Sequence, residues 1–128
     1  MSIRIDRIDH IVLTARDIAK TCDFYERALG MRAVRFGAGG RTALHFGQTK
    51  INLHHAGREF EPKAAVPAPG SADFCLITST PMEAVAAHLR SCGVQVILGP
   101  VPKGGAAGML TSVYCRAPDG NLVEVSSY

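Results

Sequence analysis

The chain repeats one pattern of secondary structure twice, and this internal repeat constrains the fold more than any other feature. In the first copy, a strand at residues 8–15 precedes a helix that begins after Asp17 and ends at Gly30. The second copy begins with a strand at 73–78, followed by a helix that ends at Gly93. Further strands are predicted near residues 32–36, 42–46, 50–55, 94–98, 110–116 and 121–126. Each half of the chain therefore predicts one βαβββ module.

The register between the two copies follows from the cost of burying charge. Superimposing the two helix-ending glycines places Asp73 on His10 and, in the last strands, Glu124 on Asn52. A register shifted by one residue would turn Asp73 into the apolar layer, where an unpaired charge costs several kcal/mol or more. We therefore expect these four polar residues to lie on the sheet faces opposite the helices.

We interpret residues 1–128 as a single domain of two modules. The first module spans about 5–57, a linker rich in proline and alanine spans about 58–71, and the second module spans about 72–128. The glycine-rich segment 100–108 is expected to be a flexible connection, with a mobile flap over a pocket as the functional alternative.

The helices carry recognisable ends and apolar stripes. Thr80 is the predicted cap of the second helix, with Pro81 at the first helical position and Glu83 at the third. The predicted buried stripes are Ile18, Cys22, Tyr25 and Leu29 in the first helix, and Met82, Val85, Ala86 and Leu89 in the second.

Composition excludes several classes of protein. With 128 residues, 47% hydrophobic content and a formal charge of +3, the chain is typical of a globular domain and gives little support to nucleic-acid binding. It has no membrane-spanning run and no signal-peptide pattern at its beginning, so we expect a cytoplasmic protein without membrane partners. The four cysteines form no Cys-x-x-Cys pair, and reduced buried thiols are expected rather than disulfides.

A carboxylate near the end of the chain needs a partner. After a Pro-Asp-Gly turn, Glu124 alternates with Val123 and Val125, and burying a carboxylate in such a strand is costly unless a cation or hydrogen-bond donors meet it. Arg116 or Arg41 could pair with it in a buried ion pair. A bound metal ion is the other interpretation.

In both modules the sheet face opposite the helix carries polar residues, and this face supports the metal interpretation. It carries His10, Asn52, His54, Asp73 and Glu124 on one side of an otherwise apolar sheet. One imidazole and two carboxylates suit a divalent cation with open positions for a substrate.

Two sequence motifs resemble a known family. The opening DHIVLTARDI...FYERALGM and the closing APDGNLVEV are similar to the vicinal oxygen chelate superfamily, which includes glyoxalase I, extradiol dioxygenases, fosfomycin-resistance thiol transferases and bleomycin-binding proteins. The second half looks closest to a subgroup of glyoxalase domain-containing protein 5 and virulence-associated glyoxalase-like proteins. The resemblance implies an α+β fold in which two tandem βαβββ modules form a curved mixed sheet around a cavity.

The resemblance also implies a set of site residues. By position, His10, Asp73 and Glu124 are the expected ligands of a divalent metal ion (Ni, Mn, Zn or Fe), although Asp73 stands where a histidine or glutamate is usual. Glu124 and His54 are the expected catalytic residues, with His54 as a second ligand candidate or a base. Substrate binding is assigned to three residues: Asn52, Tyr114 and Arg116.

Two functions follow from these expectations. The first is a metal-dependent lyase or isomerase of glyoxalase type that acts on a small oxygen-bearing substrate and works as a homodimer. Extradiol dioxygenation ranks below it because that reaction normally needs two histidines and a carboxylate on iron. The alternative is a metal-free protein that sequesters small molecules such as drugs, with Tyr114 and the glycine-rich flap holding the ligand.

Overall fold

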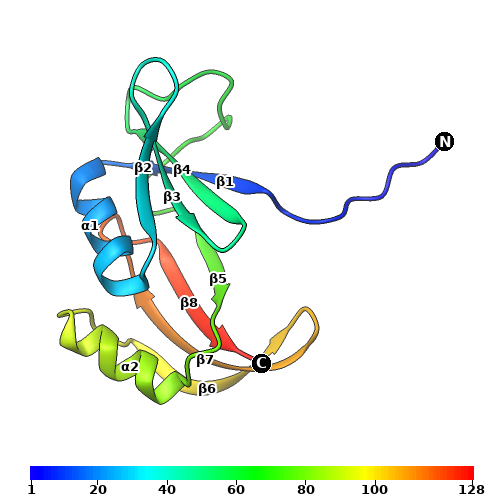
Figure 1. Cartoon of the computed structure of the whole chain (residues 1–128), viewed down its shortest axis with the longest axis vertical. Coiled ribbons are helices and arrows are strands. Elements are labelled where there is room, and N and C mark those ends of the chain that lie inside the picture. Colours follow the sequence, from blue (N-terminus) through cyan, green and yellow to red (C-terminus); the bar gives the residue numbers. More distant parts are fainter.

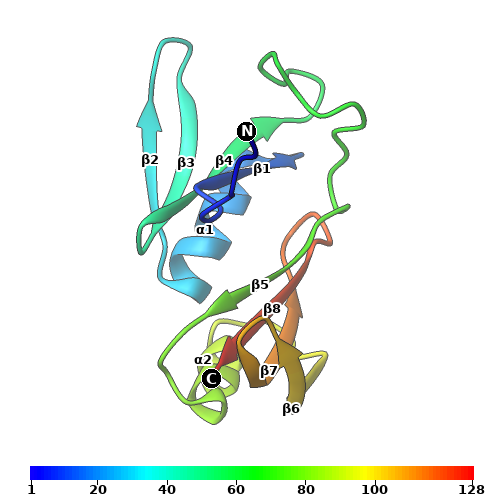
Figure 2. The same cartoon turned by 90° about the vertical axis from the view of Figure 1, so that its right-hand side faces the viewer.

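The computed structural model describes residues 1–128, which form two helices and eight strands. The strands make two four-stranded mixed sheets, each associated with one helix (Figures 1 and 2). In chain order the elements are β1 His10–Ala15, α1 Ile18–Leu29, β2 Arg32–Phe36, β3 Arg41–Phe46, β4 Thr49–His55, β5 Asp73–Ile77, α2 Met82–Ser91, β6 Leu98–Gly105, β7 Gly108–Arg116 and β8 Leu122–Ser127. This order confirms the predicted α+β fold of two βαβββ modules. Neither helix is long and apolar enough to cross a membrane.

The two sheets share one topology but stay separate within a chain. The first has the strand order β1-β4-β3-β2, with β1 parallel to β4 and the other neighbours antiparallel. The second repeats this arrangement as β5-β8-β7-β6. Strands β1 and β5 are therefore sheet edges whose outer backbone groups have no strand partner in the same chain.

Helix α1 begins and ends as the sequence predicts, but its buried side differs. The Asp17 carboxylate accepts a hydrogen bond from the Lys20 backbone N–H at 3.0 Å, and Gly30 closes the helix at φ 66°. The fully buried residues are Thr21, Phe24, Tyr25 and Ala28, whereas Ile18, Cys22 and Leu29 are half-buried. Thr21 tolerates burial because its hydroxyl donates to the Asp17 carbonyl at 2.9 Å, a local bond that a pattern of hydrophobic residues does not reveal.

Helix α2 buries the four predicted residues, Met82, Val85, Ala86 and Leu89, but begins differently. Pro81 is the residue that precedes the helix, with ψ 141°, and no side chain caps the first turn. The prediction that Thr80 is the cap is therefore wrong. Because the chain is still extended at Pro81, Thr80 lies outside the first turn, and its backbone N–H donates to the Thr78 hydroxyl at 3.1 Å.

The glycine-rich segment predicted to be a flexible connection is instead an ordered hairpin of β6 and β7. A two-residue turn at 106–107 joins the strands, whose ends pair in antiparallel register. The Ala107 backbone N–H donates to the Tyr128 hydroxyl at 3.0 Å, so the end of the chain supports the turn. The strand predicted at 94–98 is also wrong, since only Leu98 of that segment belongs to a strand.

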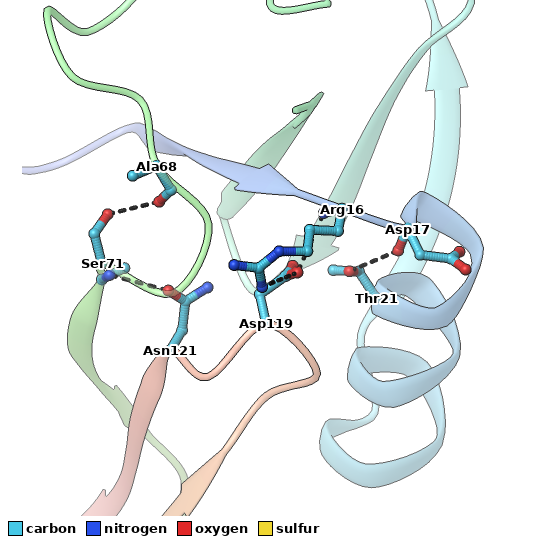
Figure 3. A network of polar contacts seen from close by, with 8 residues as sticks. Arg16, Asp17, Thr21, Ala68, Ser71, Asp119 and Asn121 are labelled. Atoms are coloured by element: carbon cyan, nitrogen blue, oxygen red, sulfur yellow. Dashed lines mark hydrogen bonds and ion pairs between the residues drawn. The ribbon is translucent and has the colours of Figure 1, made fainter. Parts of the chain in front are cut away.

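One apolar core extends through both modules. A single cluster of 17 buried residues includes Leu13 and Phe24 from the first module and Val113 and Val123 from the second. The modules are also joined through the Pro-Asp-Gly turn before β8 (Figure 3). There the Asp119 carboxylate accepts a hydrogen bond from the Arg16 backbone N–H at 3.2 Å.

A test of the β6–β7 hairpin uses two glycines of the same strand. Gly99 has φ 106°, and a Cβ atom there would collide with the Ser112 backbone carbonyl of β7. At Gly104, a Cβ atom would meet no atom within 4 Å. We predict that Gly99→Ala lowers the free energy of unfolding by about 2–4 kcal/mol, whereas Gly104→Ala changes it by less than about 1 kcal/mol. Urea denaturation of both variants measures the difference, and equal effects would contradict this packing.

A second test concerns the junction between the modules. The Asp119 side chain is only 8% exposed and also lies 3.5 Å from the Arg16 guanidinium. We predict that Asp119→Ala lowers the free energy of unfolding by about 1–3 kcal/mol, because the Arg16 backbone N–H loses its acceptor. The control is Asp23→Ala, which removes an exposed pair with Arg27 and should cost less than about 1 kcal/mol. Thermal or urea unfolding gives both values, and a loss no larger than that of the control would refute the role of Asp119.

Candidate functional site

The second sheet places the predicted polar residues on the face away from the core. In β8, Val123 and Val125 are buried in the core, while Glu124 between them is half-buried on the other face. Across the sheet, Glu124 is in register with Cys75 of β5 and Tyr114 of β7. Side chains directly opposite one another share a face, so β5, β7 and β8 all contribute to this surface.

Two serine hydroxyls hold the Glu124 carboxylate. Ser112 donates to Glu124 Oε2 at 2.7 Å and Ser126 donates to the same oxygen at 3.3 Å, while the two serine hydroxyls lie 2.6 Å apart. Neither serine was assigned to the site from the sequence. The signal was available, because each lies two residues from a site residue on the same strand and therefore on the same face.

The ion pairs considered for Glu124 do not form. Arg116 donates to the Gly120 carbonyl at 3.1 Å, and the Arg41 guanidinium lies over the Phe60 ring, 4.3 Å from its centroid. No lysine, arginine or histidine lies within ion-pair distance of Glu124. Both serine hydrogen bonds end on Oε2, and the Tyr114 hydroxyl is a further hydrogen-bonding group near this carboxylate. Glu124 is therefore a partly desolvated acceptor without a cationic partner.

A pocket of about 390 Å³ surrounds this carboxylate. It is lined by Asp73, Ile97, Leu98, Lys103, Tyr114, Arg116, Leu122 and Glu124. Lys103 Nζ lies 5.8 Å from the centroid of the Tyr114 ring. Desolvation, followed by the nearby Glu124 carboxylate, raises the pKa of Tyr114, which keeps the phenol protonated at neutral pH. Four predicted site residues thus line one pocket: Asp73, Tyr114, Arg116 and Glu124.

The first sheet carries the remaining predicted residues. His10 begins β1 and is exposed, and its Nδ1 atom lies 2.7 Å from Asp9 Oδ2, which leaves Nε2 free. A histidine whose Nδ1 is held by a carboxylate is oriented as metal-binding histidines usually are. In β4, the Asn52 Oδ1 atom is buried without a hydrogen-bond partner. Asn52 pairs in register with Val12, so it shares the face of His10.

His54 lies further along the same face, in an apolar setting. It is 9% exposed, and its ring meets the Phe60 ring edge to face, with centroids 5.6 Å apart. Burial, followed by the positive charge of Arg41, lowers the pKa of His54. The imidazole is therefore neutral at pH 7 and able to accept a proton.

Within one chain, the expected metal ligands do not converge. No group of three His, Cys, Asp or Glu side chains is arranged to hold a metal ion. The ligands predicted from the sequence are divided between two sheets, with His10 on the edge strand β1 and Asp73 on the edge strand β5. In chemical kind they suit a divalent cation, because His10 has a free ring nitrogen and Asp73 and Glu124 supply carboxylate oxygens.

The four cysteines do not provide a nucleophile for the site. The expectation that the thiols are buried is wrong for three of the four, because only Cys115 is buried, whereas Cys22 and Cys92 are half-buried and Cys75 is exposed at the edge strand β5. The Cys75 thiol donates to the Ser126 hydroxyl at 3.2 Å. Desolvation, and to a lesser degree the Glu124 carboxylate, raises the pKa of Cys75, which disfavours a nucleophilic thiolate there.

Relatives of known name cover nearly the whole chain. It is 54% identical over 124 residues to virulence protein STM3117 of Salmonella typhimurium, covering 97% of this chain and 85% of that protein. It is 51% identical over 126 residues to glyoxalase domain-containing protein RDO1 of Mycosarcoma maydis, covering 98% and 70%. The solved structure of integron cassette protein VCH_CASS1 from V. cholerae matches with a TM-score of 0.97 and 53% identity, covering 100% of this chain and 99% of that one.

More distant structures share the fold. Lactoylglutathione lyase from Agrobacterium tumefaciens matches with a TM-score of 0.73 at 22% identity, over 97% of this chain and 95% of that one. The antibiotic-binding protein TnmS3 from Streptomyces sp. CB03234 matches with a TM-score of 0.75 at 22% identity, over 98% of both chains. The family pattern itself matches residues 7–125. The chain therefore belongs to the Glyoxalase/Bleomycin resistance protein/Dioxygenase superfamily.

Proposed function

We propose that this protein is a metal-dependent lyase or isomerase of glyoxalase type that acts on a small oxygen-bearing substrate. The observation that carries the proposal is the state of Glu124, a partly desolvated carboxylate with serine donors on one oxygen and no cation on the other. Binding of a cation is more favourable for a carboxylate in this state than for one that is fully solvated or already paired with a positive charge. The name of the relative RDO1, a glyoxalase domain-containing protein, supports the same reaction type.

The complete site would form between two copies of the chain. The two half-sites lie on separate sheets, and the edge strands β1 and β5 each have one unpaired side. Large apolar side chains are exposed at these edges, among them Val12 at 46% and Ile77 at 58%. Pairing the first module of one copy with the second module of another would cover these side chains and bring His10 toward Asp73 and Glu124. A homodimer is therefore part of the proposal.

Each residue has a role in this site. His10, Asp73 and Glu124 would hold the divalent ion (Ni, Mn, Zn or Fe), which when bound supplies Lewis acidity toward two neighbouring substrate oxygens. His54, being neutral at pH 7, can take up a proton from the substrate, and the Glu124 carboxylate is a second acceptor.

Three more residues would orient the substrate. Tyr114 remains protonated and can donate from its hydroxyl, and the exposed Arg116 adds a positive charge to the lining of the same pocket. Asn52 has an acceptor oxygen without a partner, which a substrate hydroxyl can satisfy.

A metal-free binding function is the second candidate. It is favoured by a separate apolar cleft of about 510 Å³ next to His54, a size that suits a small organic molecule. The antibiotic-binding protein TnmS3 is an example of small-molecule binding by a protein of this fold. At 22% identity, its similarity to this chain shows a shared fold and no shared function. An extradiol-type dioxygenase is a weaker alternative, because the predicted ligand set contains one histidine rather than two.

Metal binding is the first test. We predict that tag-free protein binds one divalent ion per site and that its thermal unfolding temperature rises when Ni, Mn, Zn or Fe is added to metal-depleted samples. His10→Ala and Glu124→Ala should each abolish the shift, because each removes one of three ligands. His88→Ala is the control, since His88 contacts the Arg27 carbonyl outside the site and should leave the shift intact. Stoichiometric analysis that finds no metal, together with no shift from any of the four ions, would refute metal dependence.

Assembly is the second test. We predict that the protein sediments as a dimer and that Ile77→Asp converts it to a monomer, because an added charge on the β5 edge opposes pairing. The same variant should lose its metal-dependent thermal shift. Met109→Asp is the matched control, since Met109 is 67% exposed on the β6–β7 hairpin, away from both edges. A wild-type monomer that still binds metal would contradict a site shared between copies.

A further inference from the structure

A pocket of about 550 Å³ lies between α1 and the segment that follows α2. Both helices are on the same side of the molecule (Figure 1). The charged and reactive residues of the pocket are Lys20, Asp23 and Arg27 of α1, Cys92 at the end of α2, and Arg116 at the end of β7. None of the proposed metal ligands lines this interhelix pocket, so its chemistry is separate from the metal site.

Contacts between the two helices hold a thiol beside an imidazole. The Arg27 guanidinium donates to the Cys92 backbone carbonyl at 2.7 Å, and the His88 Nε2 atom lies 3.2 Å from the Arg27 carbonyl. Because a carbonyl only accepts hydrogen bonds, Nε2 carries a proton. The Cys92 Sγ atom lies 3.6 Å from this Nε2 atom and 3.6 Å from the Arg27 carbonyl. The position of the thiol is therefore fixed by residues from both modules.

These contacts place Cys92 in the surroundings in which reactive cysteines are found. Such cysteines are partly exposed and lie next to positive charge, because the thiolate is the form that attacks. Cys92 is half-buried, and the Arg27 guanidinium is bonded to its carbonyl. The His88 N–H group is close enough to stabilise negative charge that develops on the sulfur.

The other three thiols lie in different surroundings. Cys115 is buried, and burial raises its pKa to about 11. Burial also raises the pKa of Cys22. Cys75 is exposed but is in register with the Glu124 carboxylate, which repels an anionic reagent. Cys92 is the only thiol of the chain within hydrogen-bond distance of an imidazole.

The charges of the interhelix pocket favour a negatively charged reagent. Its lining includes three cations, Lys20, Arg27 and Arg116, and one carboxylate, that of Asp23. Asp23 is paired with Arg27 at 3.4 Å, whereas Lys20 and Arg116 have no carboxylate within ion-pair distance. Unpaired positive charges around a concave surface raise the local concentration of anions, and salt weakens the effect.

We propose that Cys92 is a modification site for small anionic disulfides, which the interhelix pocket binds beside the thiol. The thiol loses its proton to solvent, and the thiolate attacks one sulfur of the disulfide. A new S–S bond forms at Cys92, the original S–S bond breaks, and the released half leaves as a thiolate. The disulfide is the oxidant and needs no co-reactant. Since the step requires neither a metal nor a second copy of the chain, it is independent of the proposed function.

The experiment compares two aromatic disulfides. Dithiobis(nitrobenzoate) carries a carboxylate on each ring, and dithiodipyridine carries none. Dividing each rate by the rate of the same reagent with mercaptoethanol removes the difference in intrinsic reactivity. On this normalised scale we expect Cys92 to prefer the anionic reagent about tenfold, and we expect about 1 M salt to abolish most of that preference. Peptide mapping by mass spectrometry should find Cys92 modified before the other three cysteines.

Variants separate the roles of charge and imidazole. Lys20→Gln should lower the normalised preference about threefold, whereas Lys50→Gln, which removes the same charge from β4 outside the pocket, should retain it. His88→Ala should slow the reaction of Cys92 with both reagents by a similar factor and leave the preference unchanged, because it removes a donor to the sulfur and no charge from the lining.

Three results would overturn the proposal. They are modification of another cysteine before Cys92, equal normalised rates for the two reagents, and the same preference in Lys20→Gln as in Lys50→Gln. Cys92→Ser should remove the fast reaction and Cys75→Ser should retain it, and peptide mapping of the wild-type protein decides the question if Cys92→Ser does not fold. Modification of Cys92 in a protein that binds no metal would leave this site assigned and refute only the proposed function. Metal binding without preferential modification of Cys92 would do the reverse.

Discussion

The burial of one face of every sheet is the constraint on which the rest of this structure depends. In β8, two valines enter the core, and Glu124 between them must therefore face the other side. In β4, Asn52 alternates in the same way with the buried Ile51 and Leu53. A slip of one residue would exchange polar and apolar side chains across the whole strand, at a cost of several kcal/mol for each buried charge. The polar surface of each module is thus fixed by the packing of its core.

The same constraint explains why the fold accommodates different functions. Core packing determines which positions face the open side of each sheet, but it does not determine which residues occupy them. The fold recurs in a lactoylglutathione lyase and in an antibiotic-binding protein at 22% identity to this chain. In this protein the open positions hold an oriented imidazole, a carboxylate braced by two serines and an amide oxygen without a partner. Such incompletely satisfied groups are the residues to which function is most reasonably assigned.

Local patterns predicted most of the fold, and they failed where distant contacts decide the outcome. Asp17 and Gly30 bound α1 as expected, because caps depend on residues only a few positions apart. The segment after Gly99 was expected to be loose, yet the hydroxyl of Tyr128 supports its turn from the end of the chain. The linker likewise owes its fixed path to Phe60, which contacts side chains from two strands. Neither contact can be predicted from the amino-acid composition of these segments.

By itself, the sequence determined the two modules, the alternation within each strand and hence the side on which Glu124 and His54 lie. These properties follow from the period of two along a strand and from the free energy of removing apolar side chains from water. The tertiary structure decided that the two sheets stay separate within a chain, that serines rather than arginines meet Glu124, and that the linker closes a cleft over His54. Those outcomes depend on contacts between residues far apart in the chain, and the periodicity of residues along a single strand or helix does not predict such contacts.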